Sequence, residues 1–257
     1  LRIVEPGNTV LRELAGAPGT DAAPVVLTID RDLQLIVAQA MYDAYAYAAG
    51  NWGAPGVSSG GAAVVLDVNS GAIRALVSYP MFEPTMFNPQ SSTPTATRQA
   101  MIQATSAALT NRATQEQYAP GSVFKIITGA AALNEGLVDP DDIFDCALRW
   151  DGTSLGDTRE SRPDWRVADQ MDPAGPVTPA LALAASCNPF FYEYGALLYR
   201  RGPEKLAEYA RLMGVGRSYN LDALPSVPGR VTTPSSATAA INEAVGQGDV
   251  AIPPIQM

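Results

Sequence analysis

A serine and a lysine stand three residues apart at the start of an apolar stretch, "YAPGSVFKIITGAAALNEG", residues 118–136. Lysine is rare in this chain, since Lys125 and Lys205 are the only two lysines among 17 basic residues. The Pro-Gly pair before Ser122 favours a turn, so that Ser122 begins a helix. Because residues i and i+3 share one face of a helix, the Ser122 hydroxyl and the Lys125 amine can lie within hydrogen-bond reach.

This spacing permits a serine nucleophile with a lysine base. A helix N-terminus carries a partial positive charge and free N–H groups, which lower the pKa of a nearby ammonium and stabilise an oxyanion. A desolvated lysine can be neutral at working pH and can accept the proton of a serine hydroxyl. The same spacing also arises by chance, and then Ser122 is an ordinary N-cap and Lys125 a solvated helix residue.

A second polar pair interrupts the apolar stretch "LALAASCNPFFYEYGALL", residues 181–198. Ser186 and Asn188 fall where one predicted helix ends and another begins, because Pro189 disfavours helical backbone in the residue before it. A hydroxyl and an amide in such a turn can both point into one cleft, where serine relays a proton and asparagine binds a peptide group. An ordinary turn between two helices is the alternative interpretation.

The composition excludes several classes of protein. The chain has no histidine, whereas a Ser-His-Asp triad needs imidazole as base and catalytic zinc sites almost always use it as a ligand. A formal net charge of −9 argues against nucleic acid as a partner. No apolar run reaches the roughly 18–20 residues that span a bilayer, and no signal peptide opens the chain. Cys146 and Cys187 are too few for a disulfide framework or a metal site, and whether they pair stays open.

The predicted elements are strands first and helices after. Residues 24–29 form a strand-like run, and Asp30 then caps a helix that ends near Gly50. The runs 62–68 and 72–79 flank a turn sequence and predict a β-hairpin. Further helices are expected at 97–109, 122–135, 178–186, 190–200 and 203–213. This order indicates an α+β fold with a helical lobe that carries both polar pairs.

The chain resembles the transpeptidase domain of the class B, high-molecular-weight penicillin-binding proteins. The resemblance rests on "VVLTIDRDLQ" (25–34), "GGAAVVLDVNSGAIRALVSYPMFEP" (60–84), "NRATQEQYAPGSVFK" (111–125), "GPVTPALALAASCN" (175–188) and "AVGQGDVAIPPIQM" (244–257). Each stretch is modest, but the ordered set is specific and covers nearly the whole chain from residue 24 on. The Ser-x-x-Lys and Ser-x-Asn motifs of these enzymes match the two polar pairs.

The resemblance implies a β-lactamase/transpeptidase-like fold, with an antiparallel sheet, helices and a mostly helical lobe that carries the nucleophile. It implies that Ser122 is acylated and that Lys125 activates it. Ser186 would then help move the proton to the leaving amine, and Asn188 would hold the donor peptide. The implied reaction attacks the D-Ala-D-Ala end of a peptidoglycan stem peptide, after which a neighbouring stem's amine takes the acyl group. β-Lactams mimic the donor, and no metal or other cofactor is implied.

The chain departs from the family in one motif, because no Lys-Thr-Gly occurs. In the family that motif lies beyond the "GQG" stretch, here residues 246–248, and supplies an oxyanion N–H and the substrate carboxylate pocket. We therefore expect residues 25–257 to be a transpeptidase domain that lacks its C-terminal sheet strands and is inactive by itself. The hairpin edge along 62–68 should then be unpaired. Residues 1–24, rich in Gly, Pro and Ala, are expected to be a linker or the remnant of a preceding domain.

The resemblance also implies a location and partners. An upstream segment would anchor the protein at the extracytoplasmic face of the bacterial membrane, and a membrane glycosyltransferase would work beside it. Peptidoglycan stem peptides and β-lactam antibiotics would be its ligands. Two alternatives stay open. A β-lactam-sensing or catalytically degenerate module would be acylated without making cross-links, whereas a serine β-lactamase would release the acyl group rapidly.

Overall fold

The computed structural model describes residues 2–4, 10–13, 26–52, 60–87, 93–104, 106–219, 221 and 224–257. The helices are α1 (Arg31–Asn51), α2 (Thr95–Ala104), α3 (Arg112–Gln115), α4 (Lys125–Asn134), α5 (Pro179–Ala184), α6 (Asn188–Arg201), α7 (Lys205–Leu212) and α8 (Ala237–Ala244). The strands are β1 (Arg2–Val4), β2 (Val10–Glu13), β3 (Gly61–Leu66), β4 (Ile73–Tyr79), β5 (Phe144–Cys146), β6 (Arg149–Trp150), β7 (Arg162–Pro163) and β8 (Gly175–Val177). Short 3₁₀ turns are η2 (Pro84–Phe87), η3 (Ser106–Leu109), η4 (Gly121–Phe124), η5 (Thr153–Leu155), η6 (Trp165–Val167) and η7 (Pro254–Gln256).

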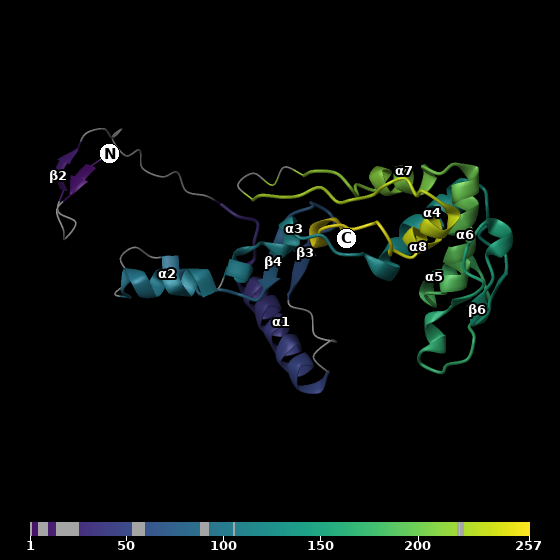
Figure 1. Cartoon of the computed structure of the whole chain (residues 1–257), viewed down its shortest axis with the longest axis horizontal. Coiled ribbons are helices and arrows are strands. Elements are labelled where there is room, and N and C mark those ends of the chain that lie inside the picture. The colour runs from purple at the N-terminus through teal and green to yellow at the C-terminus, as the bar shows by residue number, and fades with distance from the viewer. Residues whose placement is uncertain are drawn as a thin grey trace.

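The molecule is elongated, with its helices gathered mainly at one end (Figure 1). Helices α4 to α8 and the short strands β5 to β8 make up this helical lobe, while the β3–β4 hairpin and α1 lie near the middle. At the opposite end β1 and β2 pair with each other in antiparallel fashion, so the stretch expected to be a linker contains two short strands. The α+β class predicted from the order of elements is confirmed.

The predicted β-hairpin is confirmed as β3 and β4, which pair in antiparallel register from Gly61 opposite Tyr79. The Asp67 carboxylate closes the turn by accepting from the N–H groups of Asn69 and Ser70, each at 3.0 Å. Among the described residues β3 pairs with no strand other than β4, so its second edge is unpaired, as expected.

Helix α1 begins where the sequence predicts, because the Asp30 side chain accepts from two N–H groups of the first turn. The helix packs against β4, and its Gln34 amide both donates to and accepts from the backbone of Leu76, at 2.8 and 2.7 Å. The strand predicted at 24–29 is wrong for its described part, which has no strand pairing. Thr28 Oγ1 donates to the Ile73 carbonyl, and the N–H of the following Asp30 donates to the Arg74 carbonyl, so this part of the chain is tied to β4 by single hydrogen bonds.

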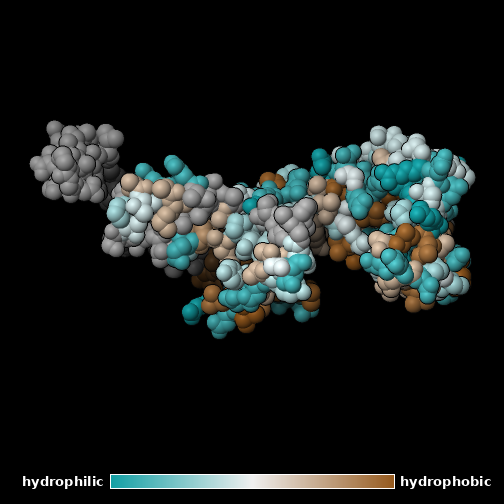
Figure 2. Space-filling model, turned by 60° about the horizontal axis from the view of Figure 1, so that its bottom comes forward, coloured by the Kyte–Doolittle hydropathy of each residue, from teal (hydrophilic) through white to brown (hydrophobic). Residues whose placement is uncertain are grey.

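The spacing in α1 predicts a buried face of Leu33, Ile36, Val37, Ala40, Met41 and Ala44. The structure corrects this, because Ile36 is 65% exposed and Ala48 is the buried residue of the helix. Leu33, Val37 and Met41 are half-buried, because α1 rests on a two-stranded hairpin rather than on a broad sheet. Figure 2 shows the result as hydrophobic side chains scattered among hydrophilic ones on the protrusion formed by α1.

The helical lobe holds the two main clusters of buried apolar residues. Helix α6 packs against α4, α7 and α8. Its contact with α8 is close, because a side chain at Gly195 would overlap Ala244. The spacing in α4 predicts that Phe124, Ile127, Ala131 and Leu133 are buried. The first three are, but Leu133 is 39% exposed near the end of the helix.

Two extended segments connect the lobe with the hairpin region. Tyr118, just before the Ser122 turn, exchanges backbone hydrogen bonds with Ile252 at 3.0 and 2.8 Å. Ala251 does the same with Arg230. The chain thereby runs back from α8 to η7, which lies against β3 and α3. These pairings fix where the Ser122 turn leaves the middle of the molecule and enters the lobe.

Candidate active site

The turn that carries Ser122 is η4, which continues directly into α4. Its first residue, Gly121, has a left-handed backbone with φ of 61°, and its N–H donates to the Gly246 carbonyl at 2.9 Å. Gly246 is left-handed too, and a side chain there would overlap the Gly121 backbone. Glycine is therefore required at 246, because the "GQG" segment touches the backbone beneath Ser122.

Lys125 is fully buried one turn beyond the exposed Ser122. Its Nζ donates to the Ser186 carbonyl at 2.8 Å, to Ser186 Oγ at 3.0 Å and to Asn188 Oδ1 at 2.5 Å. The Phe191 ring lies 5.3 Å from the same nitrogen. The amine therefore ends among three oxygen acceptors and one aromatic face, and every acceptor comes from the second polar pair.

The connection between Ser122 and Lys125 runs through Ser186. Ser186 Oγ lies 3.2 Å from Ser122 Oγ and 3.0 Å from Lys125 Nζ. The structure thus brings the four polar residues together. The direct contact between Ser122 and Lys125 is not formed, because the hydroxyl of Ser186 stands between them. The arrangement is a chain of two hydroxyls that ends on an amine.

Burial changes the acidity of the Lys125 ammonium. Loss of water around the side chain lowers its pKa from the usual 10.5 to about 8, because the charged form loses its hydration. Two charged neighbours act in opposite directions: the Asp164 carboxylate raises this pKa and the Arg166 guanidinium lowers it. Burial is the largest effect, so a substantial fraction of Lys125 is neutral near physiological pH.

Ser186 lies in the turn between α5 and α6, and Asn188 is the first residue of α6, at the helix boundary that the sequence predicts. Helix α5 ends at Ala184, and α6 begins at Asn188 with Cys187 as its N-cap and Pro189 in its first turn. Ser186 has a left-handed backbone with φ of 50°, which is uncommon for a residue other than glycine. This backbone lets both the carbonyl and the hydroxyl of Ser186 meet the same nitrogen of Lys125.

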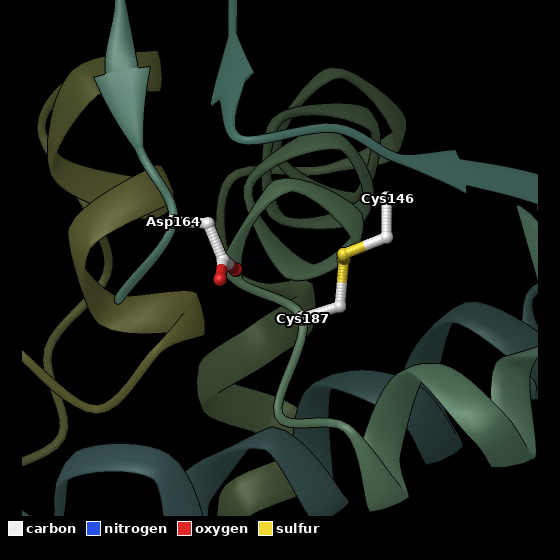
Figure 3. Close-up of side chains that lie close together, drawn as sticks. All are labelled: Cys146, Asp164 and Cys187. Carbon is white, nitrogen blue, oxygen red and sulfur yellow. A yellow bond between two sulfur atoms is a disulfide. The ribbon is translucent and has the colours of Figure 1, made fainter. Parts of the chain in front are cut away.

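A disulfide joins this turn to β5. Cys187, between the two motif residues, is bonded to Cys146, and both are buried. The pairing left open by the sequence is therefore formed. Figure 3 shows the Asp164 carboxylate next to this disulfide, with Asp164 on the segment that follows β7. We call the Cys146–Cys187 bond the active-site disulfide.

The polar residues open onto a cleft of about 390 Å³. Its walls are Gly121, Ser122, Trp165, Ser186, Asn188, Tyr192, Val245 and Gln247. The sequence pointed to Ser122, Ser186 and Asn188, and it placed Gln247 only in the matched "GQG" stretch without a role. Tyr192 was missed, although it stands four residues after Asn188 and therefore on the same face of α6.

Comparison with known proteins identifies the family of this chain. The family model described as the penicillin binding protein transpeptidase domain matches residues 61–257. The peptidoglycan D,D-transpeptidase PbpA of Mycolicibacterium smegmatis is 33% identical over 213 residues, which are 76% of this chain and 38% of that protein. The chain thus spans less than two fifths of the length of this relative. The peptidoglycan D,D-transpeptidase MrdA of Escherichia coli K12 is 26% identical over 96% of this chain and 36% of its own length.

Solved structures show the same fold. The crystal structure of PBPA from Mycobacterium tuberculosis is 30% identical and superposes with a TM-score of 0.69, covering 89% of this chain and 48% of that one. PBPA has also been solved as a penicillin G acyl-enzyme complex. A peptidoglycan synthase complex contains a chain that is 30% identical, with a TM-score of 0.77 over 98% of this chain and 44% of its own. The chain belongs to the penicillin-binding protein transpeptidase domain family.

Proposed function

We propose that this chain forms the nucleophile-bearing part of a peptidoglycan D,D-transpeptidase that works through an acyl-enzyme on Ser122. The observation that carries the proposal is the hydrogen-bonded path from Ser122 through Ser186 to the buried Lys125, which opens onto a cleft. Family membership supports the same reaction class, since PbpA and MrdA are both named peptidoglycan D,D-transpeptidases.

In the acylation step Ser122 Oγ attacks the carbonyl carbon between the two terminal D-alanines of a stem peptide. The Ser122 proton passes to the Ser186 hydroxyl, which passes its own proton to neutral Lys125. Collapse of the tetrahedral intermediate breaks the carbon–nitrogen bond, and the proton held by Lys125 passes through the Ser186 hydroxyl to the leaving D-alanine amine, while Ser122 Oγ stays bonded to the acyl carbon. A lysine with a pKa of about 8 suits both roles, because it takes and releases a proton near neutral pH.

In the second step the amine of a neighbouring stem peptide attacks the acyl carbon. Its proton goes to Lys125, the new amide bond forms, and the carbon–oxygen bond to Ser122 breaks as Ser122 regains its proton. Asn188 lines the cleft, and its Oδ1 faces Lys125. The Nδ2 group of the same amide is then the donor available for a carbonyl of the bound peptide. The N–H of Ser122, in the first turn of η4, supplies one donor to the oxyanion.

We also propose a glycosyltransferase partner and an extracytoplasmic location for the protein to which this chain belongs. The partner is supported by the similar chain in a peptidoglycan synthase complex, which coordinates polymerization and crosslinking. Peptidoglycan cross-linking takes place outside the cytoplasm, which supports the location. Among the described residues, no helix has both the length and the apolar composition needed to cross a membrane.

Covalent labelling tests the proposed function. The purified protein is incubated with a fluorescent penicillin, digested, and examined by mass spectrometry to find the labelled peptide. We expect one adduct, on Ser122, and no labelling of Ser122→Ala. An adduct on another residue, or full labelling of Ser122→Ala, would contradict the assignment. A stem-peptide substrate with an acceptor amine then distinguishes cross-linking from mere acylation.

A further inference from the structure

The turn that presents Ser186 needs support from outside itself. Ser186 has φ of 50° without being glycine, a conformation that side chains disfavour and that persists only where the surroundings hold it. The turn must nevertheless keep two Ser186 oxygens and Asn188 Oδ1 on Lys125 Nζ, because these are the contacts of the buried amine.

Asp164 holds the far end of this turn. Its Oδ2 accepts from the backbone N–H of Asn188 at 2.9 Å. Its other oxygen, Oδ1, accepts from the Arg166 backbone N–H at 3.1 Å and from the Arg166 guanidinium at 2.9 Å. Asp164 is 2% exposed, so these hydrogen bonds take the place of water around its carboxylate. One oxygen serves the turn and the other fixes Arg166.

Arg166 holds the near end of the same turn. Its Nη2 donates to the Ala185 carbonyl at 2.7 Å. The guanidinium lies over the ring of Trp165, 4.6 Å from the ring centre, and Trp165 also lines the cleft. The ion pair therefore binds the Ala185 carbonyl and the Asn188 N–H, so that Ser186 and Cys187 lie between its two contacts.

A buried ion pair is a poor device for stability, because desolvation of both charges offsets their attraction. Such a pair instead fixes the positions of the groups that it contacts, because removing either partner leaves the other charge buried without a hydrogen-bond partner. The helical lobe offers a comparison in Asp157 and Arg162, whose side chains are 0% and 3% exposed. That pair contacts Thr238 and Asn242 of α8 instead of the Ser186 turn.

We propose that Asp164 and Arg166 are positioning residues, which clamp the turn from Ala185 to Asn188 in the geometry that brings Ser186 and Asn188 onto Lys125. This inference rests on the proposed function of Ser122 and Lys125. The clamp touches neither the substrate nor the reacting atoms. It acts through the two backbone groups that bracket the motif, and through its two charges near the Lys125 amine.

The pH dependence of acylation distinguishes the contribution of Asp164 from that of Arg166. We measure the second-order rate constant of penicillin acylation between pH 6 and 9.5 for Asp164→Asn and for Arg166→Gln. Both should lower the limiting rate by about 10- to 100-fold, the scale of a misplaced reacting group. Their inflections should move in opposite directions from about 8. Loss of Asp164 lowers the Lys125 pKa, whereas loss of Arg166 raises it.

Asp157→Asn is the matched control, because it breaks an equally buried ion pair in the same lobe. It should lose comparable thermal stability while keeping the wild-type limiting rate and inflection. If Asp164→Asn or Arg166→Gln does not fold, the double variant replaces it, since it leaves no unpaired charge. The double variant should lose about tenfold in limiting rate, the lower end of that range, with its inflection near the wild-type value.

Three outcomes would overturn the clamp while Ser122 is still acylated in the wild-type protein. The first is a wild-type limiting rate in the folded variants. The second is a shift of both inflections in the same direction, and the third is an equal rate loss in Asp157→Asn. Failure of wild-type acylation at Ser122 would instead overturn the proposed function.

Discussion

The lowered pKa of Lys125 predicts how the rate constant of acylation depends on pH. With a pKa of about 8, roughly one lysine in eleven is neutral at pH 7, whereas an ordinary value of 10.5 would leave about 3 in 10,000 neutral. Burial thus raises the population of the competent base about 300-fold at pH 7. Because neutral Lys125 is required, the acylation rate constant should rise about 90-fold from pH 6 to pH 9 and level off above pH 8.

The assay is stopped-flow acylation by a fluorescent penicillin at fixed ionic strength, corrected for spontaneous hydrolysis of the β-lactam. Lys125→Arg should lose about 10²-fold or more, because arginine stays protonated throughout this range. Lys205→Arg is the matched control, since the chain has only these two lysines. Lys205 pairs with Glu135 at 3.1 Å and should keep the wild-type rate and profile.

Three results would refute this reasoning. A flat profile would show that no group titrating near pH 8 limits acylation. An inflection near 10.5 would show that burial does not shift Lys125 in solution. Near-wild-type acylation by a folded Lys125→Arg would show that the base is another group, and Ser186 acting through a chain of water would then replace Lys125.

Substitutions at two glycines, at the active-site disulfide and at Glu243 test other parts of the structure. Gly246→Ala should lose both stability and acylation, because its side chain would overlap the Gly121 backbone. Gly248 is also left-handed, but the nearest atom to a side chain there lies at 3.3 Å, so Gly248→Ala should lose stability alone. Thermal unfolding measures the stability of both variants, and penicillin labelling measures their acylation. Replacing both cysteines of the active-site disulfide by alanine should cost about 4 kcal/mol in denaturant unfolding, the value for a loop of 41 residues, and a smaller loss would mean that the unfolded chain is already compact. The Glu243 pKa is raised to about 7 by burial, so the stability of the wild-type protein should fall as pH rises from 4.5 through 7. Glu243→Gln should therefore be more stable by up to about 3 kcal/mol at pH 8 and equal at pH 4, and a constant difference at both pH values would contradict the shift.

The sequence predicts an element correctly where its local signals and its tertiary contacts favour the same structure. Asp30 caps α1, and the turn after Asp67 closes the β3–β4 hairpin, so both elements lie near their predicted positions. Pro189 marks the boundary between α5 and α6 for the same reason. The two polar pairs were visible because each has a fixed short spacing, which the backbone converts into a fixed direction.

The missed features depend on contacts between distant segments. Strands β5 and β7 are two or three residues long and exist through pairing with β8 and β6, which no local pattern reveals. Asp164 sits 24 residues before the Asn188 N–H that it accepts from, in a polar loop that carries no local signal of this contact. The disulfide spans 41 residues, and its formation depends on a distance that sequence does not contain.

The position of Ser186 between Ser122 and Lys125 has a consequence for the charge state of the site. As an ammonium, Lys125 has three N–H donors for three oxygens, and the Ser186 hydroxyl must then donate to Ser122, 3.2 Å away. As a neutral amine it keeps two donors for the two carbonyl oxygens, and its lone pair faces Ser186 Oγ. The Ser186 hydroxyl then turns to donate to Lys125, and the freed oxygen accepts from Ser122. Loss of one proton therefore reverses two hydrogen bonds and aligns them for attack, without moving a heavy atom.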